Sequence, residues 1–225
     1  MRNIVIGIEG EVGSGKTSAC RELTKIIENC VFIDGGAIYR GIILAISKAG
    51  IDLKNQSFES FDAFEVMKKL NVDFKIENKE TVIYINGKKI ENSEIETENN
   101  SIGVTEVASK VNNKAMFEFA RKVIEKYSKK YNVVVSARGL VYIYPNMDYH
   151  IYITASLDER VKRRYNEYKG QYTYEQIKQT IMNRDLLHKN AGFNKTCDRT
   201  IKVDISECKN AKESAEKILH EMENK

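Results

Sequence analysis

The stretch Ile4-Val5-Ile6-Gly7-Ile8-Glu9-Gly10-Glu11-Val12-Gly13-Ser14-Gly15-Lys16-Thr17 decides the fold. Residues 4–9 are almost all apolar and rich in β-branched side chains, which predicts a buried strand of a parallel sheet. Residues 10–17 then match the pattern G-x-x-x-x-G-K-[ST] at every fixed position. A glycine-rich turn can arise by chance, but its place between a predicted strand and a predicted helix favours a phosphate-binding loop.

The residue types in this loop suit the binding of a nucleotide. Glycines let the backbone turn tightly and direct its N–H groups at a phosphate, at the positive end of the following helix. Lys16 supplies a mobile positive charge for the β- and γ-phosphates, and Thr17 supplies an oxygen ligand for Mg²⁺. The residues expected to bind the donor nucleotide are Gly10, Glu11, Val12, Gly13, Ser14, Gly15, Lys16, Thr17 and Ser18.

The composition is that of an ordinary globular protein, with 42% apolar and 30% charged residues among 225. This length suits a single domain over 1–225 with an inserted lobe, and nothing requires a partner for folding, so we expect a monomer. Lys and Arg exceed Asp and Glu by only four, 36 against 32, and are scattered, which favours a small anionic substrate over nucleic acid. No apolar run approaches 18 residues, so we expect neither a membrane span nor a signal peptide.

The cysteines and histidines do not have the spacing of metal ligands. The three histidines, His150, His188 and His220, lie far apart, so we expect structural or solvated roles for them. Without any C-x-x-C pair, the cysteines are expected to be reduced thiols of a cytoplasmic protein. The four cysteines are Cys20, Cys30, Cys197 and Cys208.

The apolar pattern alternates between strand and helix along the chain. A helix at 16–29 is followed by a strand at 31–33 that ends in Asp34-Gly35-Gly36, at the sheet edge where ligands of open α/β folds bind. From residue 72 the period changes to two, with polar turns at 77–79 and 86–87, which predicts an inserted hairpin lobe at about 70–100. The other expected elements are helices at 38–49, around 58–70, at about 104–129 with a candidate break at 112–113, at 157–188 with a break at 169–171 and at 211–222, and strands at 133–135, 149–154 and 200–203.

In their order and spacing these motifs resemble the bacterial cytidylate kinase family, P-loop enzymes that move the γ-phosphoryl group of ATP onto CMP or dCMP. The resemblance rests on the loop at 10–17, on the hairpin at 72–90 and on Asp34-Gly-Gly-Ala-Ile-Tyr-Arg40 against D-[ST]-G-A-[IM]-Y-R. It also rests on residues 155–164, ASLDERVKRR, against A-S-x-x-x-R-x-x-R-R, and on Arg184-Asp185. It implies an α/β P-loop kinase with a central parallel sheet flanked by helices, a hairpin lobe that binds the nucleoside monophosphate, and a helical lid at about 156–190.

The resemblance also implies roles for individual residues around the phosphates. Phosphoryl transfer needs positioning and positive charge around an anionic transition state, so a lysine, Mg²⁺ and several arginines suffice. Arg40 and Arg138 would hold the acceptor phosphate, while Arg160 and Arg163, on a mobile lid, and Arg184 would reach the transferring group. The implied catalytic residues are Lys16, Arg138, Arg160, Arg163 and Arg184, and the implied acceptor-binding residues are Asp34, Gly36, Arg40, Ser109, Arg138 and Arg184.

The sequence departs from the family pattern in the acceptor half. The motif D-G-R-D reads Ser136-Ala137-Arg138-Gly139, and R-D-x-x-D-x-x-R reads RDLLHKNA at 184–191, which lacks the second acid and the second arginine. Gly35 replaces a family serine, and Glu118 aligns with an expected arginine. Since a site that hydrogen-bonds a base loses discrimination when its partners are absent, these changes predict relaxed or redirected acceptor specificity.

Three functions therefore stay open at this stage. The first is a nucleoside monophosphate kinase that gives CDP or dCDP and ADP. The second is an ATP-binding sensor or partner-binding module that has lost acceptor chemistry, and the third is a kinase for a different small metabolite. The five retained arginines favour a kinase, because a sensor has little use for so many phosphate-directed cations. The GTPase motif N-K-x-D does not fit the spacing of residues 194–198.

Overall fold

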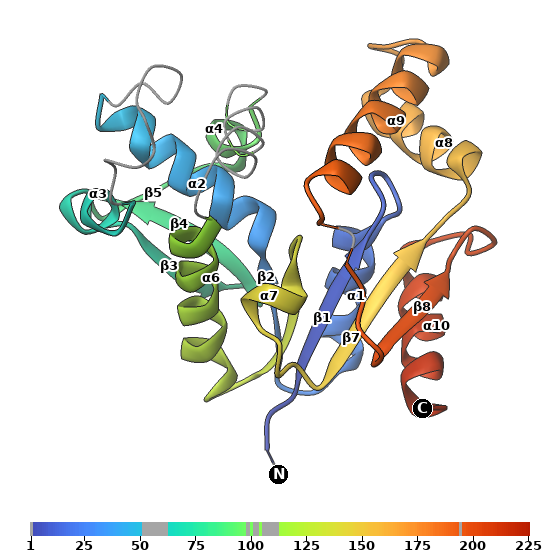
Figure 1. Ribbon diagram of the computed structural model, residues 1–225, viewed down its shortest axis with the longest axis horizontal. Helices are drawn as coiled ribbons and strands as arrows, with labels where there is room; N and C mark the ends of the chain where they lie inside the picture. The colour runs from blue at the N-terminus through green and yellow to red at the C-terminus, as the bar shows by residue number, and fades with distance from the viewer. Residues whose placement is uncertain (1, 51–62, 98–99, 101–103, 105–112, 194) are drawn as a thin grey trace. The chain divides into compact units, whose positions relative to one another are not determined.

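The computed structural model describes residues 2–50, 63–97, 100, 104, 113–193 and 195–225. The chain divides into two compact units, one made of Met1–Phe32 with Tyr131–Lys225 and the other of Ile33–Lys130. Strand β2 (Cys30–Asp34) leads from the first unit into the second (Figure 1). Within the described part of the chain, no helix combines the length and apolarity needed to cross a membrane.

The first unit is built on a parallel sheet, as the sequence predicts. Its strands are β6 (Asn132–Ser136), β1 (Val5–Gly10), β7 (Tyr149–Thr154) and β8 (Thr200–Asp204), in that order, with β2 beyond β6. All six residues of β1 are buried, because helices and loops cover both faces of a parallel sheet. The expected α/β fold, a mainly parallel sheet flanked by helices, is confirmed.

Helices α1 (Lys16–Ile26) and α10 (Ala211–Glu223) pack on one face of this sheet. Leu23 of α1 and Ile218 of α10 are fully buried against Ile6 and Ile8 of β1. Helix α1 ends three residues before the predicted position, and Asn29 with a φ of 48° turns the chain into β2.

The opposite face of β1 is approached closely by α7 (Leu140–Ile143) and the loop after it. A Cβ atom added at Gly7 would lie 2.4 Å from Sδ of Met147 and 3.2 Å from Cδ1 of Leu140. The lack of a side chain at Gly7 therefore allows the start of α7 to lie against the strand. Glu9 is on the same face of β1, because alternate residues of a strand point the same way.

Helices α8 (Leu157–Tyr168) and α9 (Tyr174–Asn190) pack against each other as a helical pair beside the loop after β1 (Figure 1). The break predicted at 169–171 is confirmed, since Lys169 and Gly170 have φ values of 46° and 82°. Val12 of the loop packs in a small hydrophobic core with Val161 of α8 and with Ile177 and Ile181 of α9. The pair is therefore packed onto the loop by apolar contact.

The second unit contains the predicted hairpin, here with three antiparallel strands. They are β3 (Asp73–Glu77), β4 (Glu80–Ile85) and β5 (Lys88–Lys89). The tight turns have positive φ at Asn78 and Lys79 and at Asn86 and Gly87, as two-residue hairpin turns require. The helices of this unit are α2 (Gly35–Lys48), α3 (Ala63–Lys69), α4 (Asn92–Ile95) and α6 (Asn113–Ser128).

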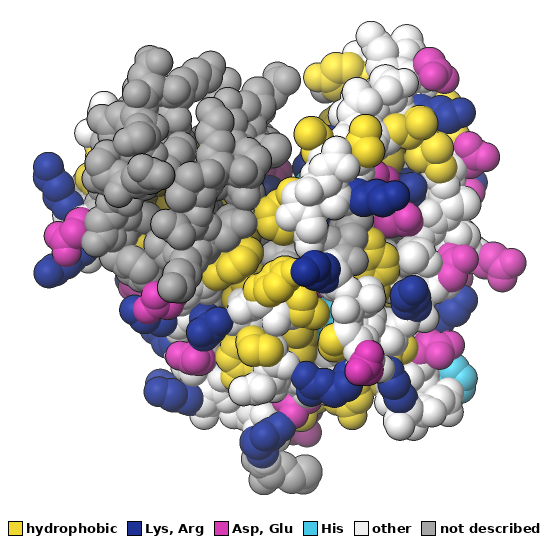
Figure 2. All heavy atoms as spheres, viewed as in Figure 1, with side chains coloured by type: hydrophobic (Ala, Val, Ile, Leu, Met, Phe, Trp, Pro, Cys, Tyr) yellow, Lys and Arg dark blue, Asp and Glu magenta, His cyan; other side chains and the backbone are white. Residues whose placement is uncertain are grey.

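Some expectations for this unit fall beyond the described residues. Ser109, the candidate acceptor-binding residue, lies outside them, as does the first half of the helix predicted at 58–70. The second half is α3, and the helix predicted at about 104–129 is described as α6 from Asn113 onward. Charged side chains of both signs are intermixed on the face of the described residues that Figure 2 shows.

Candidate functional site

The phosphate-binding loop, residues 10–17, turns through three glycines with positive φ. Gly10, Gly13 and Gly15 have φ values of 148°, 76° and 91°. A Cβ atom at Gly10 would lie 2.1 Å from the carbonyl oxygen of Ile153, so no other residue fits there. Gly15 precedes α1 in a left-handed conformation, and no side chain of the described residues caps this helix. The first N–H groups of α1 are thus oriented for an anion, as the sequence predicts.

Lys16 folds back onto the loop that carries it. Its ammonium donates to the carbonyl oxygens of Gly10 at 3.0 Å and Glu11 at 2.5 Å, and lies 3.5 Å from Oγ of Ser14. Burial lowers the pKa of Lys16 from 10.5 to about 7, and the charges of Arg138 and Arg164 add to the lowering. The negative charge of a bound phosphate would favour the protonated lysine.

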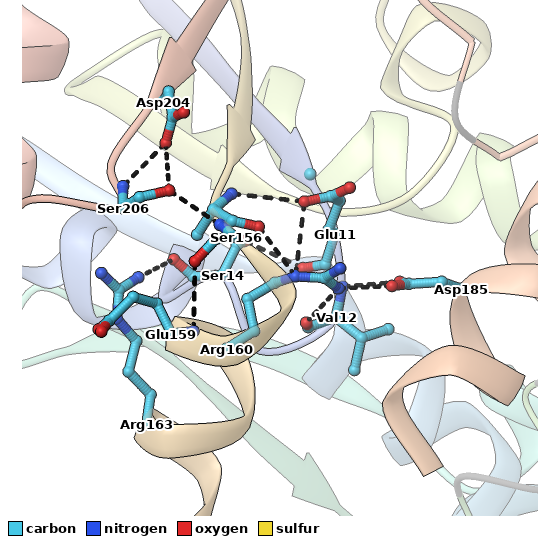
Figure 3. A network of polar contacts seen from close by, with 12 residues as sticks. Glu11, Val12, Ser14, Ser156, Glu159, Arg160, Arg163, Asp185, Asp204 and Ser206 are labelled. Carbon is cyan, nitrogen blue, oxygen red and sulfur yellow. Dashed lines mark hydrogen bonds and ion pairs between the residues drawn. The ribbon is translucent and has the colours of Figure 1, made fainter. Parts of the chain in front are cut away.

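Arg160 of α8 binds the loop from the carbonyl side (Figure 3). Its side chain is buried, and the residue is only 6% exposed. Its Nε donates to the carbonyl oxygen of Ala155 at 3.0 Å, and its Nη1 donates to that of Val12 at 3.1 Å. The charge is balanced by Asp185, whose Oδ2 lies 2.5 Å from Nη1, and by Glu11, whose Oε2 lies 3.6 Å from Nε.

Arg163, one turn further along α8, holds a second carbonyl of the loop. Its Nη1 donates to the carbonyl oxygen of Ser14 at 3.0 Å (Figure 3). Its Nη2 donates to the carbonyl oxygen of Ile205 at 2.8 Å. Arg160 and Arg163 therefore both contact the phosphate-binding loop itself. Their role at the transferring phosphoryl group stays a prediction, because either side chain would have to exchange these partners for phosphate oxygens.

Lys16, Arg138 and Arg184 form a group that we call the cationic cluster. Arg138 follows β6, and burial lowers the pKa of its guanidinium to about 10, with Arg184 of α9 as the largest contributing charge. Asp185 and Glu9 act in the opposite direction and favour the charged form of Arg138. Lys16 and Arg184, two of the five residues predicted to be catalytic, thus each lie within electrostatic reach of a third, Arg138.

Two acidic residues beside this cluster were not assigned from the sequence. Glu9, at the end of β1, is 2% exposed and accepts hydrogen bonds from the N–H groups of Gly139 at 2.6 Å and Leu140 at 3.1 Å. Asp185 accepts the N–H of Val12 at 3.0 Å. The sequence signal for Glu9 is a lone acid in an apolar strand, and for Asp185 its place next to Arg184.

His188 is half-buried and also lies near the cationic cluster, which is compatible with the structural role expected from the sequence. Burial lowers the pKa of its imidazole from 6.5 to about 3, and Arg138, Arg184 and Lys16 add to the lowering. Its Nδ1 is buried and has no hydrogen-bond partner among the described residues. The chain thus places a neutral imidazole where the family motif has its second acid. His150, in contrast, is a buried and hydrogen-bonded residue of β7, as predicted.

The acceptor-binding residues predicted in the second unit, Asp34, Gly36 and Arg40, lie at the start of α2. Asp34 caps α2, since its Oδ1 accepts the N–H of Ala37 at 3.1 Å. A Cβ atom at Gly36 would lie 3.1 Å from Oδ1 of Asp34 and 3.2 Å from Nη1 of Arg40, so Arg40 folds over the start of its helix. The Nε atom of Arg40 is buried and lacks a hydrogen-bond partner among the described residues. A bound anion would supply one.

Thr17 suits the predicted Mg²⁺ ion. Its hydroxyl is half-buried on the second residue of α1, directly after Lys16. Among the described residues, no three His, Cys, Asp or Glu side chains gather as a metal cage. Mg²⁺ bound with a nucleotide needs no such cage, because phosphates and water supply most of its ligands and one hard oxygen from the protein suffices. The donor set of the loop therefore fits the ion.

Comparison with known proteins identifies the family of this chain. The family model described as cytidylate kinase matches residues 6–224. The cytidylate kinase of Clostridioides difficile (strain 630) is 32% identical over 198 residues, which cover 86% of this chain and 85% of that protein. The cytidylate kinase of Thermosipho africanus (strain TCF52B) is 35% identical over 184 residues, which cover 80% of this chain and 76% of that protein.

A solved structure shows the same fold. The crystal structure of TT1252 from Thermus thermophilus matches with a TM-score of 0.50 and 14% identity, over 100% of this chain and 98% of that chain. This likeness concerns the fold alone, whereas the family model and the relatives cover almost the whole sequence. The chain therefore belongs to the cytidylate kinase family and is an ATP-dependent phosphotransferase of the nucleoside monophosphate kinase type.

Proposed function

We propose that this protein transfers the γ-phosphoryl group of ATP to a pyrimidine nucleoside monophosphate, CMP or dCMP, and releases CDP or dCDP and ADP. The observation that carries the proposal is the convergence of Lys16, Arg138 and Arg184 beside a phosphate-binding loop. Such a cluster suits a reaction whose transition state spreads negative charge over a loose phosphoryl group. The names of the relatives support the choice of acceptor.

In this proposal the residues of the first unit bind and orient ATP. The backbone N–H groups of the loop and Lys16 hold the β- and γ-phosphates, and the hydroxyl of Thr17 holds Mg²⁺, which supplies charge neutralisation for the phosphates. A phosphate oxygen of the acceptor forms a bond to the γ-phosphorus while the bond from that phosphorus to the β–γ bridging oxygen breaks. Arg138 and Arg184 stabilise the charge on the transferring oxygens, with Arg160 and Arg163 of the lid joining them.

The acceptor is assigned to the second unit. Arg40 donates to the acceptor phosphate through its otherwise unpartnered Nε, next to Asp34 and Gly36. The hairpin lobe, at about 70–100, covers the nucleoside, and Ser109 contributes to recognition of the base. The helices at about 156–190 act as a lid that excludes water, because water at the γ-phosphate would hydrolyse ATP.

A second candidate is a kinase-like protein that binds ATP as a sensor or partner-binding module, or acts on another small metabolite. The observation that favours it is the chemistry of the acceptor side. Serine and glycine stand at 136 and 139, where the family has acids, and His188 and Ala191 replace the second acid and the second arginine. The retained cationic cluster makes the kinase the better proposal.

The test is ADP release from Mg·ATP by the purified protein, with CMP, dCMP, UMP, AMP and GMP added one at a time. A rate with CMP or dCMP well above that without acceptor supports the proposal. ATP binding without stimulation by any of the five contradicts it and favours the second candidate. Preference for another nucleotide keeps the kinase activity and corrects the substrate.

Two variants of lysines in the same helix test whether the loop is the site of this activity. Lys16→Ala is expected to lower the rate by about 100-fold or more, because the charge on the β- and γ-phosphates is lost. Lys25→Ala is the control, since Lys25 lies in the last turn of the same helix and forms an ion pair with Glu22 at the surface. Full transfer by a folded Lys16→Ala variant would refute the assignment of the loop.

The surroundings expected of the protein follow the same proposal. All four cysteines are free thiols, which suits a reducing, cytoplasmic environment. A monomer that binds nucleotides is the expected active form. Sedimentation of the purified protein with and without ATP would test that state.

A further inference from the structure

Glu9 and His150 form a buried polar chain that starts at β8 and ends at the backbone next to Arg138. Oγ1 of Thr200 lies 2.8 Å from Nδ1 of His150, and Nε2 of His150 lies 2.8 Å from Oε2 of Glu9. Glu9 and His150 are each 2% exposed. A carboxylate only accepts hydrogen bonds, so Nε2 of His150 carries the hydrogen and donates a hydrogen bond to Glu9.

The carboxylate of Glu9 holds the peptide group that follows Arg138. Its Oε1 accepts the N–H of Gly139 at 2.6 Å, and its Oε2 accepts that of Leu140 at 3.1 Å. The nitrogen of Gly139 is bonded to the carbonyl carbon of Arg138, so this contact fixes the ψ angle of Arg138. Glu9 also caps α7, because Gly139 is the N-cap and has no side chain of its own.

The arrangement of the sheet explains how Glu9 meets Gly139, which lies 130 positions later in the sequence. Gly7 pairs with His150, and His150 pairs with Thr200, in neighbouring parallel strands. Gly7 has no side chain, which lets Leu140 approach β1 and brings the start of α7 over Glu9. Glu9 therefore lies between His150 on one side and the Arg138 backbone on the other.

We infer that Glu9, oriented by His150, is a positioning residue that sets the direction of the Arg138 side chain for phosphoryl transfer. This inference rests on the proposed function for its kinetic consequences, but not for the geometry. The negative charge of Glu9 also favours the charged form of Arg138. In Glu9→Gln an NH2 group replaces one carboxylate oxygen, so at least one of the N–H groups of Gly139 and Leu140 loses its acceptor and the peptide group beside Arg138 is held less firmly.

The kinetic test is a double-mutant cycle. Glu9→Gln is expected to lower kcat and raise the acceptor KM, with a combined loss in kcat/KM of about 10- to 100-fold, the range seen when an orienting partner is removed. In an Arg138→Ala background the same change is expected to have little further effect, because there is no guanidinium left to position. Equal losses in both backgrounds would overturn the inference.

Two further variants separate positioning from a loss of stability. His150→Gln removes the imidazole without touching the phosphate-binding loop and is expected to give the same pattern as Glu9→Gln, more weakly. Ile151→Val is the control, since Ile151 is fully buried next to His150 but belongs to the core on the other face. If Ile151→Val lost as much stability as Glu9→Gln and showed a similar loss of kcat, the effect would be one of stability, and the inference would be overturned.

A measurement without turnover keeps the test independent of the proposed function. In NMR spectra, the amide protons of Gly139 and Leu140 are expected to exchange faster and to shift upfield in Glu9→Gln, with a change in the guanidinium signal of Arg138. Ile151→Val should leave these signals in place. If no acceptor is phosphorylated, the proposed function fails while this result still decides the inference, and unchanged Gly139, Leu140 and Arg138 signals would overturn it.

Discussion

The carboxylate of Asp185 and the guanidinium of Arg160 meet at 2.5 Å, and together they bracket one residue of the phosphate-binding loop. Asp185 accepts the N–H of Val12, while Arg160 donates to the carbonyl oxygen of the same residue (Figure 3). The pair therefore connects α8 and α9 to the loop through polar contacts, in addition to the apolar contact of Val12.

Asp185→Asn is expected to lower the free energy of unfolding by about 2–3 kcal/mol, because the largely buried Arg160 loses the nearer of its two carboxylate partners. Urea unfolding at pH 7 measures this change. Glu175→Gln, at an exposed position in the first turn of α9, is the matched loss of a carboxylate and should change stability by less than about 0.5 kcal/mol. Equal stability of the two variants would show that the ion pair adds nothing.

Gly10→Ala and Gly87→Ala test the fit of the loop against the sheet. Both glycines have positive φ, so both variants carry backbone strain of about 1–2 kcal/mol. Gly87 has open space around it, whereas Gly10 meets the carbonyl oxygen of Ile153. We expect Gly87→Ala to fold with a modest loss and Gly10→Ala to lose at least about 3 kcal/mol more or to fail to fold. A normally stable Gly10→Ala would contradict the close approach.

Arg40→Ala tests the acceptor site. The acceptor KM is expected to rise by about 10- to 100-fold and kcat to fall, since a guanidinium–phosphate contact is lost, while the KM for ATP stays within about twofold. Steady-state kinetics with each substrate varied in turn separate these constants. Lys48→Ala, near the end of the same helix, is the control. An unchanged acceptor KM and kcat would remove Arg40 from the site.

His188 is expected to make the protein less stable in acid. The folded protein keeps its imidazole neutral down to a pKa of about 3, whereas the unfolded chain takes up the proton near 6.5. Between these values the unfolded state binds more protons, so stability is fully present above about pH 6.5 and is lost as the pH falls toward 3.

Urea unfolding of the wild type and His188→Gln from pH 4 to pH 8 measures this contribution. The variant should lose stability less steeply below pH 6.5, while the difference between the two proteins should be constant from pH 7 to pH 8. The latter range serves as the internal control. Parallel curves over the whole range would show that the imidazole titrates alike in both states.

The fold was predictable because its turns and helix ends are determined by short stretches of sequence. The loop follows from glycines at fixed positions and the lysine after them, and the hairpin from Asn78-Lys79 and Asn86-Gly87 turns between alternating apolar residues. The helical pair follows from the break at 169–171, where Lys169-Gly170 ends one helix.

The contacts of the site were less predictable, because they join residues that are distant in the sequence. The partners of Glu9 at 139, 140 and 150 follow from the order and register of strands, which apolar periodicity does not specify. The family resemblance predicts that Arg160 and Arg163 reach the phosphoryl group, but no sequence pattern indicates that they bind carbonyl oxygens of the loop. The low pKa of His188 depends first on its burial in the tertiary structure and then on the charges of Arg138, Arg184 and Lys16.

The ammonium of Lys16 donates to two backbone carbonyls of its own loop, so the ATP binding that we propose is an exchange of partners rather than a simple addition. The phosphates must draw the ammonium away from Gly10 and Glu11, and part of their attraction is offset by the hydrogen bonds that are broken. The same carbonyls take the ammonium back once the phosphates leave. The same contacts thus offset part of the binding free energy of any phosphate at the loop, which favours exchange of the nucleotide over tight retention.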